Sequence, residues 1–107
     1  MDEQEFQKHA DEALTKLFRL LVTAGDDYGF EADMTGGAIA VEFEDPPAKF
    51  VISPNSPVRQ IWVSALSKSY KLDWDEVEQT FVLGDLTLKE LIEQAIAKQT
   101  GEGAIEI

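Results

Sequence analysis

The chain has 107 residues, which is enough for one hydrophobic core but not for two, so we expect a single domain over residues 1–107. Asp and Glu number 21 against 9 Lys and Arg, and the formal net charge of −12 repels phosphate backbones, which argues against nucleic acid as a partner. There is no cysteine, and this excludes disulfides, thiolate metal sites and cysteine nucleophiles.

The N-terminal segment MDEQEFQKHADE is acidic and polar, unlike a secretory signal or a mitochondrial presequence. No stretch approaches the roughly 18 apolar residues that a membrane-spanning helix needs. We therefore expect a cytoplasmic monomer with no membrane contact.

A long first helix is predicted by apolar residues that recur every three or four positions: Phe6, Ala10, Ala13, Leu14, Leu17, Leu21 and Ala24. It is expected to run from Glu3 to Ala24 and to end at Gly25. Phe18 and Val22 lie outside this stripe, so either the stripe is wide or an apolar pair is exposed. The wide stripe is favoured, because Phe18 can lean over Leu14 or Leu21.

Strands are predicted next, from alternating apolar residues bounded by turn residues. A loop of residues 26–29 precedes them, and a turn built from Pro54, Asn55 and Pro57 leads into the fourth strand. The expected strands are residues 30–34, residues 38–44, a strand containing Phe50 and Ile52, the strand ending at Ala65, residues 70–74 and residues 80–83.

A second helix is predicted to start at Thr87, because Glu90 three residues later completes a capping box, and to end near Gly101. Ile105 and Ile107 in the tail either tuck into the groove between the helices or fray. The order of elements indicates an α+β fold: a two-layer sandwich in which an antiparallel sheet of five to six strands carries both terminal helices on one face.

Trp62 is the most informative residue of the fourth strand. Alternation places Ile61 and Val63 on one face, and Gln60 and Trp62 on the other. If Ile61 and Val63 are buried, Trp62 lies on the outer face of the sheet, where its large rigid indole suits partner binding. The alternative, in which Trp62 packs against neighbouring strands or a returning loop, stays open from the residues alone.

Catalytic apparatus is not visible in the sequence. His9 is the only histidine and is expected to be a solvated residue near the start of the first helix. No nucleophile with a base, phosphate-binding loop or zinc-binding spacing accompanies it, so we expect no enzymatic activity.

Carboxylates are concentrated in the first 45 residues, which contain 12 acidic and 3 basic residues. Asp26, Asp27, Glu31 and Asp33 form the tightest group. Such a group is either a weak site for hard cations or a solvated acidic surface that aids solubility.

The acidic first helix and three segments, GGAIAVEFE, PVRQIWV and LKELIEQAI, make the chain resemble the frataxin family in its bacterial form. The resemblance covers essentially the whole chain, and PVRQIW is its most specific part. It implies a frataxin-like sandwich and a role as an iron-binding regulator, or iron chaperone, of iron–sulfur cluster assembly.

The resemblance also implies which residues carry that role. Weakly bound iron (Fe²⁺ or Fe³⁺) would lie on an acidic ridge comprising Asp11, Glu12, Asp26, Asp27, Glu31 and Asp33. The cysteine desulfurase and the iron–sulfur scaffold protein would bind a sheet surface comprising Asn55, Gln60 and Trp62. Bacterial frataxins usually carry further carboxylates near the end of the first helix, where this chain has Phe18, Arg19 and Val22, so fewer and weaker iron sites are expected.

Two alternatives to this function stay open. One is an iron store or ferroxidase, which needs a dense, partly desolvated carboxylate site. The other is an acidic interaction domain that has lost iron binding.

Overall fold

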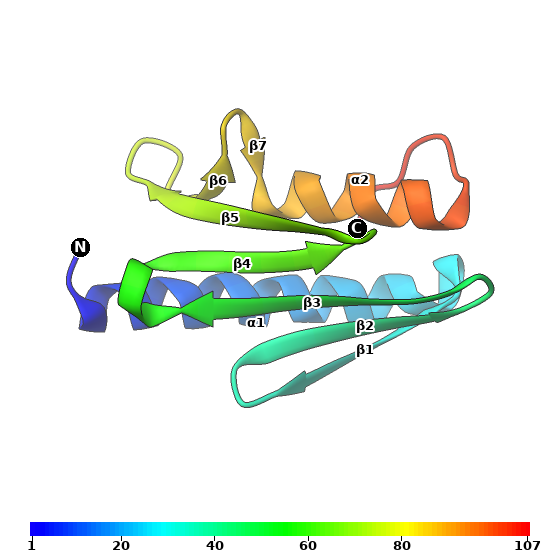
Figure 1. The fold of residues 1–107 in the computed structure, drawn as a ribbon, viewed down its shortest axis with the longest axis horizontal. Coiled ribbons are helices and arrows are strands. Elements are labelled where there is room, and N and C mark those ends of the chain that lie inside the picture. The colour runs from blue at the N-terminus through cyan, green and yellow to red at the C-terminus, as the bar shows by residue number, and fades with distance from the viewer.

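The computed structural model describes all residues from 1 to 107 and contains two helices and seven strands (Figure 1). In chain order these are α1 (Glu3–Tyr28), β1 (Phe30–Thr35), β2 (Ala38–Glu44), β3 (Pro47–Asn55), the short 3-10 helix η1 (Ser56–Val58), β4 (Gln60–Ala65), β5 (Lys68–Asp75), β6 (Thr80–Leu83), β7 (Leu86–Thr87) and α2 (Leu88–Thr100). The strands form one antiparallel sheet in the order β1 to β7. The sheet exceeds the predicted five to six strands because the two-residue β7 precedes α2.

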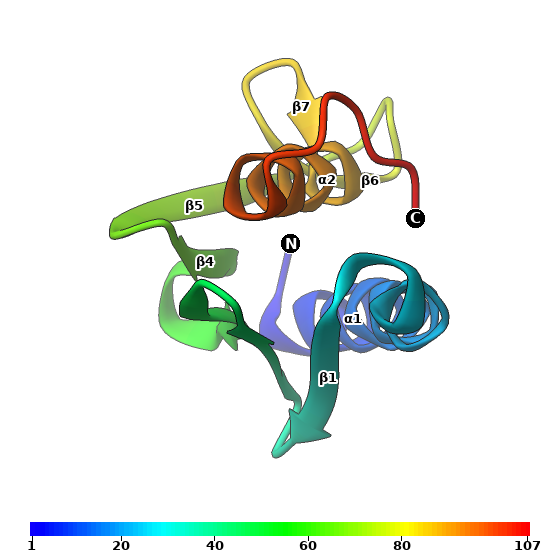
Figure 2. The same ribbon diagram turned by 90° about the vertical axis from the view of Figure 1, so that its right-hand side faces the viewer.

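Both helices pack on one face of the sheet, as predicted for a two-layer α+β sandwich (Figure 2). Strand β2 shows why: Ile39, Val41 and Phe43 are buried, whereas Glu42 and Glu44 are exposed on the other side. No polar or charged residue is buried, so the core between the layers is entirely apolar. Neither helix is both long and apolar enough to span a lipid bilayer.

Helix α1 is longer than predicted, because Gly25 does not end it. The helix continues to Tyr28 and ends at Gly29, whose left-handed backbone (φ 75°) lets its N–H donate to the Gly25 carbonyl at 2.9 Å. Gly25 instead allows a close approach: a Cβ atom there would lie 2.5 Å from the Phe30 carbonyl oxygen. Asp26 and Asp27 therefore lie in the last turn of α1 and not in a loop.

The α1 surface also settles the position of Phe18 and Val22. Phe18 is half-buried against the core, whereas Val22 is 53% exposed. The wide stripe therefore includes Phe18 only.

The turn between β3 and β4 differs from the prediction. Pro54 and Asn55 belong to β3, and the turn is η1, which ends at Arg59 in the left-handed region (φ 54°). The Gln7 side-chain amide donates to the Ser56 hydroxyl, so this turn is tied to α1.

His9 is not a freely solvated residue. Its ring stacks on Trp74 of β5 with ring centroids 3.9 Å apart and planes 18° from parallel. Trp74 in turn packs edge-on against buried Phe81. The sequence missed this contact because the pairing of α1 with β5 is not a local pattern.

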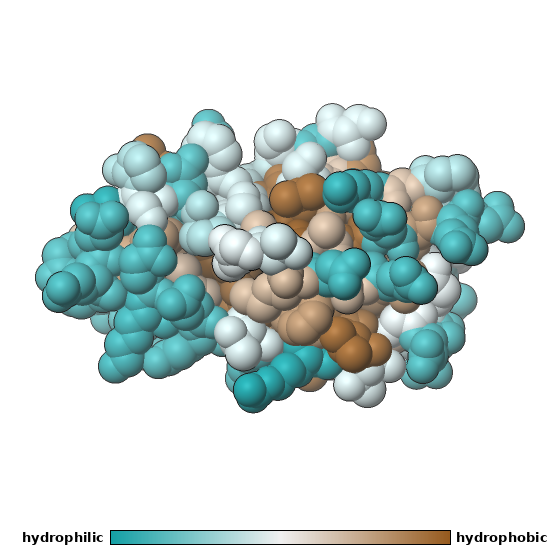
Figure 3. Space-filling view, turned by 90° about the horizontal axis from the view of Figure 1, so that it is seen from below, coloured by the Kyte–Doolittle hydropathy of each residue, from teal (hydrophilic) through white to brown (hydrophobic).

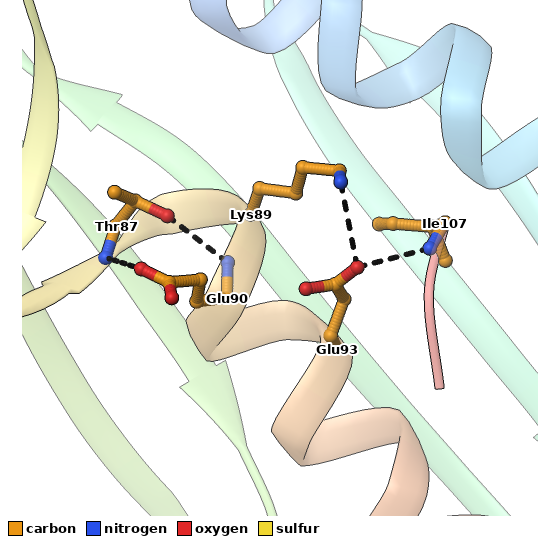
Figure 4. Close-up of polar contacts among 5 residues, drawn as sticks. All are labelled: Thr87, Lys89, Glu90, Glu93 and Ile107. Carbon is orange, nitrogen blue, oxygen red and sulfur yellow. Dashed lines mark hydrogen bonds and ion pairs between the residues drawn. The ribbon is translucent and has the colours of Figure 1, made fainter. Parts of the chain in front are cut away.

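Helix α2 begins and ends as predicted, with a complete capping box at Thr87 and Gly101 as its C-cap (Figure 4). The Thr87 backbone N–H donates to Glu90 Oε1 at 3.0 Å, and the Glu90 N–H donates to Thr87 Oγ1 at 3.2 Å. The hydrogen bond from the Thr87 backbone has the largest effect on the Glu90 carboxyl and holds its pKa below the usual value. The bond with the Thr87 side chain lowers that pKa further.

The C-terminal tail lies between the two helices, which confirms the first of the two interpretations of its isoleucines (Figure 2). Ile105 is buried in the core. The Ile107 N–H donates to Glu93 Oε2 at 3.0 Å, and Lys89 Nζ lies 3.5 Å from the same oxygen (Figure 4). The tail therefore covers part of the helix layer and leaves the outer sheet face free.

Candidate functional site

The outer face of the sheet, opposite the helices, carries polar residues around Trp62. The strand register sets them in two adjacent rows across β3, β4 and β5: Ser53, Trp62 and Lys71 in one row, and Asn55, Gln60 and Asp73 in the other. The three residues predicted to face a partner, Asn55, Gln60 and Trp62, are thus neighbours on one surface.

Trp62 is 38% exposed, and its neighbours hold the indole in place. Its Nε1–H donates to Gln60 Oε1 at 3.0 Å, and the Gln60 amide nitrogen donates to Asp73 Oδ1 at 3.0 Å. Lys71 Nζ lies 4.9 Å from the indole centroid, within cation–π range. The exposed alternative for Trp62 is therefore correct, and the ring is fixed before any partner arrives.

A hollow of about 350 Å³ opens beside Trp62 on the same face. It is lined by Val51, Ser53, Trp62, Val63, Ser64, Ser69, Tyr70 and Lys71. Apolar walls with a few hydroxyl groups and one cation suit a small side chain of a partner more than a phosphate or a metal ion.

The acidic end of the molecule lies where α1 meets β1 and β2. A hollow of about 320 Å³ there is lined by Gly25, Asp26, Gly29, Phe30, Glu31, Glu42 and Glu44. The structure thus brings Asp26 and Glu31 together, as predicted, and adds Glu42 and Glu44 to them.

The other predicted metal ligands do not join this hollow. Asp27 lies beside Asp26 in the last turn of α1, and Asp33 lies on β1 beyond Glu31. Asp11 and Glu12 lie about 20 Å further back along the helix axis, next to Lys16 and Arg19. No three acidic or histidine side chains converge closely enough to hold one ion.

The acidic end carries its charge at a cost in stability. Glu31 and Glu42 are direct cross-strand partners, and like charges in such pairs repel. Asp26 and Asp27 lie at the C-terminal end of α1, where the helix dipole disfavours anions and no basic residue compensates. The only ion pair in the molecule joins Lys89 to Glu93, far along the chain from these acids.

Sequence reasoning missed Lys71, Asp73, Glu42 and Glu44 as members of these two surfaces. Lys71, Asp73 and Glu42 are the cross-strand partners of Trp62, Gln60 and Glu31, and Glu44 follows Glu42 on the same face of β2. Alternation alone placed Glu42 and Glu44 on the outer face, but only the strand register shows which residues lie beside them.

The helix–meander–helix order and the two-layer packing define a small α+β sandwich. It offers two surfaces, one on the sheet face opposite the helices and an acidic one where the end of α1 meets β1 and β2. Within this class, the family model described as "Frataxin-like domain" matches residues 1–102, and the chain belongs to that family. The resemblance to bacterial frataxins that the sequence indicated is therefore confirmed.

Two known proteins illustrate the similarity. The "Iron-sulfur cluster assembly protein CyaY" of Dechloromonas aromatica is 28% identical over 105 residues, which cover 98% of each chain. The solved structure of frataxin from Psychromonas ingrahamii, which its authors present as a model for stability modulation within the CyaY family, superposes with a TM-score of 0.80 at 21% identity. That match covers 99% of this chain and 97% of the other, and it shows the shared fold.

Proposed function

We propose that this chain is a non-enzymatic regulator of iron–sulfur cluster assembly that binds the cysteine desulfurase and its scaffold protein in the cytoplasm. The family membership and the similarity to a protein named for iron–sulfur cluster assembly support the process. The observation that carries the proposal is the exposed Trp62 on the outer sheet face, held by its hydrogen bond to Gln60.

The Trp62 surface has the properties of a binding hot spot. Its hydrogen bond to Gln60 and the Lys71 ammonium already restrict the ring, so little conformational entropy is lost on docking. The hollow beside it offers a place for a side chain of the partner. Large rigid aromatic rings next to such pockets dominate the energy of many protein interfaces.

The acidic end would serve as the second contact. Carboxylates that repel one another within the free protein are relieved by a basic surface on the partner. Their field also extends into solvent and speeds the approach of a positively charged protein, with a strong dependence on salt. The stability cost paid by Glu31, Glu42, Asp26 and Asp27 supports this use.

Iron is proposed to bind weakly at the same acidic end. Asp26, Glu31 and Glu42 line one open hollow, and oxygen ligands of this kind suit hard cations. A ferroxidase or iron store needs several carboxylates around each ion, and the spacing of these acids favours the regulator over that alternative. If the chain binds no metal in the test below, the remaining alternative is an acidic interaction domain that has lost iron binding.

The metal part is tested by adding Mn²⁺, a paramagnetic stand-in for Fe²⁺, to the ¹⁵N-labelled chain and recording amide broadening. Broadening is expected to be confined to residues 25–33 and 42–44, which surround the acidic hollow. The double variant Asp26→Asn, Glu31→Gln should remove most of it.

The matched control is Asp11→Asn, Glu12→Gln, which removes the same charge from the middle of α1 and should leave the broadening unchanged. Equal loss in both double variants, or broadening spread evenly over all the acids, would contradict a localised site. No broadening at all would leave the partner-binding part of the proposal intact and remove iron from it.

A further inference from the structure

Strand β1 forms an open edge of the sheet. It pairs only with β2, and its other side has no strand beside it. No backbone hydrogen bond outside the helices and strands involves residues 30–35, and no side chain bonds to their backbone. An edge of this kind is a template for another strand unless something blocks it.

The hairpin fixes which backbone groups point outwards. Gly36 and Gly37, both with positive φ, form a two-residue turn, which is closed by hydrogen bonds between Thr35 and Ala38. Because bonded and non-bonded pairs alternate, Glu31 and Asp33 also bond to β2. The N–H and C=O groups of Ala32 and Met34 are therefore the ones directed to the open edge.

The start of the strand is already occupied. The outward carbonyl of Phe30 lies against Gly25 of α1, so close that a Cβ atom at Gly25 would not fit between them. The open part of the edge thus runs from Glu31 to Thr35, long enough for a partner strand of about five residues.

Side chains beside this edge are acidic on one face of the sheet and apolar on the other. Glu31 and Asp33 are exposed on the outer face of the sheet, and Ala32 and Met34 are half-buried on the inner face. Seen from below Figure 1, the side on which β1 lies, the surface shows an apolar patch between two hydrophilic ends (Figure 3).

Two residues of α1 extend the apolar side. Val22 and Phe18 precede Gly25 by three and seven residues, so they lie on the same side of the helix, the side that contacts β1. Val22 is 53% exposed, because no other part of the chain covers it. An added strand would find carboxylates on one of its faces and these apolar side chains on the other.

We propose that the β1 edge, together with Phe18 and Val22, binds a short extended segment of a partner protein in which basic and apolar residues alternate. Its backbone pairs with Ala32 and Met34, its basic residues meet Glu31 and Asp33, and its apolar residues cover Val22 and Met34. The period-two alternation of a strand matches this two-sided surface.

Charge decides against a second copy of the chain as the occupant. Two β1 strands paired edge to edge would set Glu31 and Asp33 against the same acids of the other molecule, and such like-charge pairs are destabilising. The net charge of −12 opposes self-association further. A basic segment would instead be attracted both to Glu31 and Asp33 across the strand and to the net negative charge of the chain.

The test uses the full ¹⁵N-labelled chain and a capped synthetic heptapeptide of alternating Lys and Val, KVKVKVK. At a peptide concentration of ten times the Kd, water exchange of the Ala32 and Met34 amides is expected to slow about tenfold, because only about a tenth of the edge stays free. The Glu31 and Asp33 amides, already bonded to β2, should change much less. The control peptide KKVVVKK has the same charge and composition and should give no such protection.

A matched pair of protein variants tests the apolar side. Val22→Asp should raise the Kd of the alternating peptide about tenfold or more, whereas Val77→Asp, at a 90% exposed position in the β5–β6 turn, adds the same charge and should leave it unchanged within twofold. Both positions are exposed, so both variants should fold.

Three results would overturn the proposal: binding without protection of Ala32 and Met34, equal protection by both peptides, or edge protection that arises from dimerisation of the chain itself. The experiment contains no assembly protein and no iron. Its outcome is therefore separate from that of the proposed function, although both surfaces include Glu31.

Discussion

Replacing Trp62 with alanine is expected to weaken binding of the desulfurase–scaffold assembly by about thirtyfold or more, the effect of losing a hot-spot residue worth about 2 kcal/mol. The fold should persist, because Trp62 lies on the outer face and is 38% exposed. Isothermal titration calorimetry of the variant against the purified assembly measures the loss directly.

Two further variants separate the contributions of the indole. Trp62→Phe keeps a large ring but removes the N–H that bonds to Gln60, so its affinity should fall between those of the native chain and the alanine variant. Val77→Ala changes another exposed apolar residue, which lies in the β5–β6 turn outside the Trp62 rows, and should bind normally. If the alanine variant binds the assembly with an affinity within twofold of the native chain, Trp62 is not a hot spot.

Gly25→Ala is expected to destabilise the protein by about 1–3 kcal/mol, the usual cost of forcing extra atoms into a packed site. The new Cβ would lie 2.5 Å from the Phe30 carbonyl oxygen, so α1 or β1 must shift. The direction is diagnostic, because in an ordinary helix interior the same change stabilises by about 1 kcal/mol. Urea unfolding followed by circular dichroism measures it.

Gly103→Ala is the control for that experiment. Nothing lies within 4 Å of a Cβ atom at Gly103, so its stability should stay within about 0.5 kcal/mol of native. A stabilising Gly25→Ala would show that the close approach of α1 to β1 has been misjudged, and with it the placement of Asp26 beside Glu31.

Much of the architecture follows from local patterns. In β2 the alternation of large apolar residues indicates the buried face, because a strand with one face on the core has no other register that buries Ile39, Val41 and Phe43. In β4 alternation alone left the position of Trp62 open, and the buried Ile61 and Val63 show that it lies on the outer face. The Thr87–Glu90 capping box located the start of α2 to the residue.

Other features depend on contacts between distant segments, and no local pattern predicts them. Gly25 looks like a helix stop, yet its role is to admit the Phe30 carbonyl. His9 looks like a surface residue, yet it stacks on Trp74, 65 positions later. Lys71 becomes part of the Trp62 surface only through the β4–β5 register.

The candidate site shows the same division. Composition located the excess of acids in the first 45 residues, but not their arrangement. The structure gathers Asp26 and Glu31 with Glu42 and Glu44, and leaves Asp11 and Glu12 far along the helix. Charge density is visible in a sequence, whereas convergence on one point is a property of the fold.

The chain contains two tryptophans, and their indole N–H resonances in one ¹H–¹⁵N spectrum test directly whether the outer sheet face is the docking surface. When the unlabelled desulfurase–scaffold assembly is added, the Trp62 signal should shift or broaden strongly, because its N–H lies on the exposed face. The Trp74 signal, whose Nε1 is buried beneath the helix layer, should keep its position. Saturating complex formation with an unchanged Trp62 indole would contradict the account.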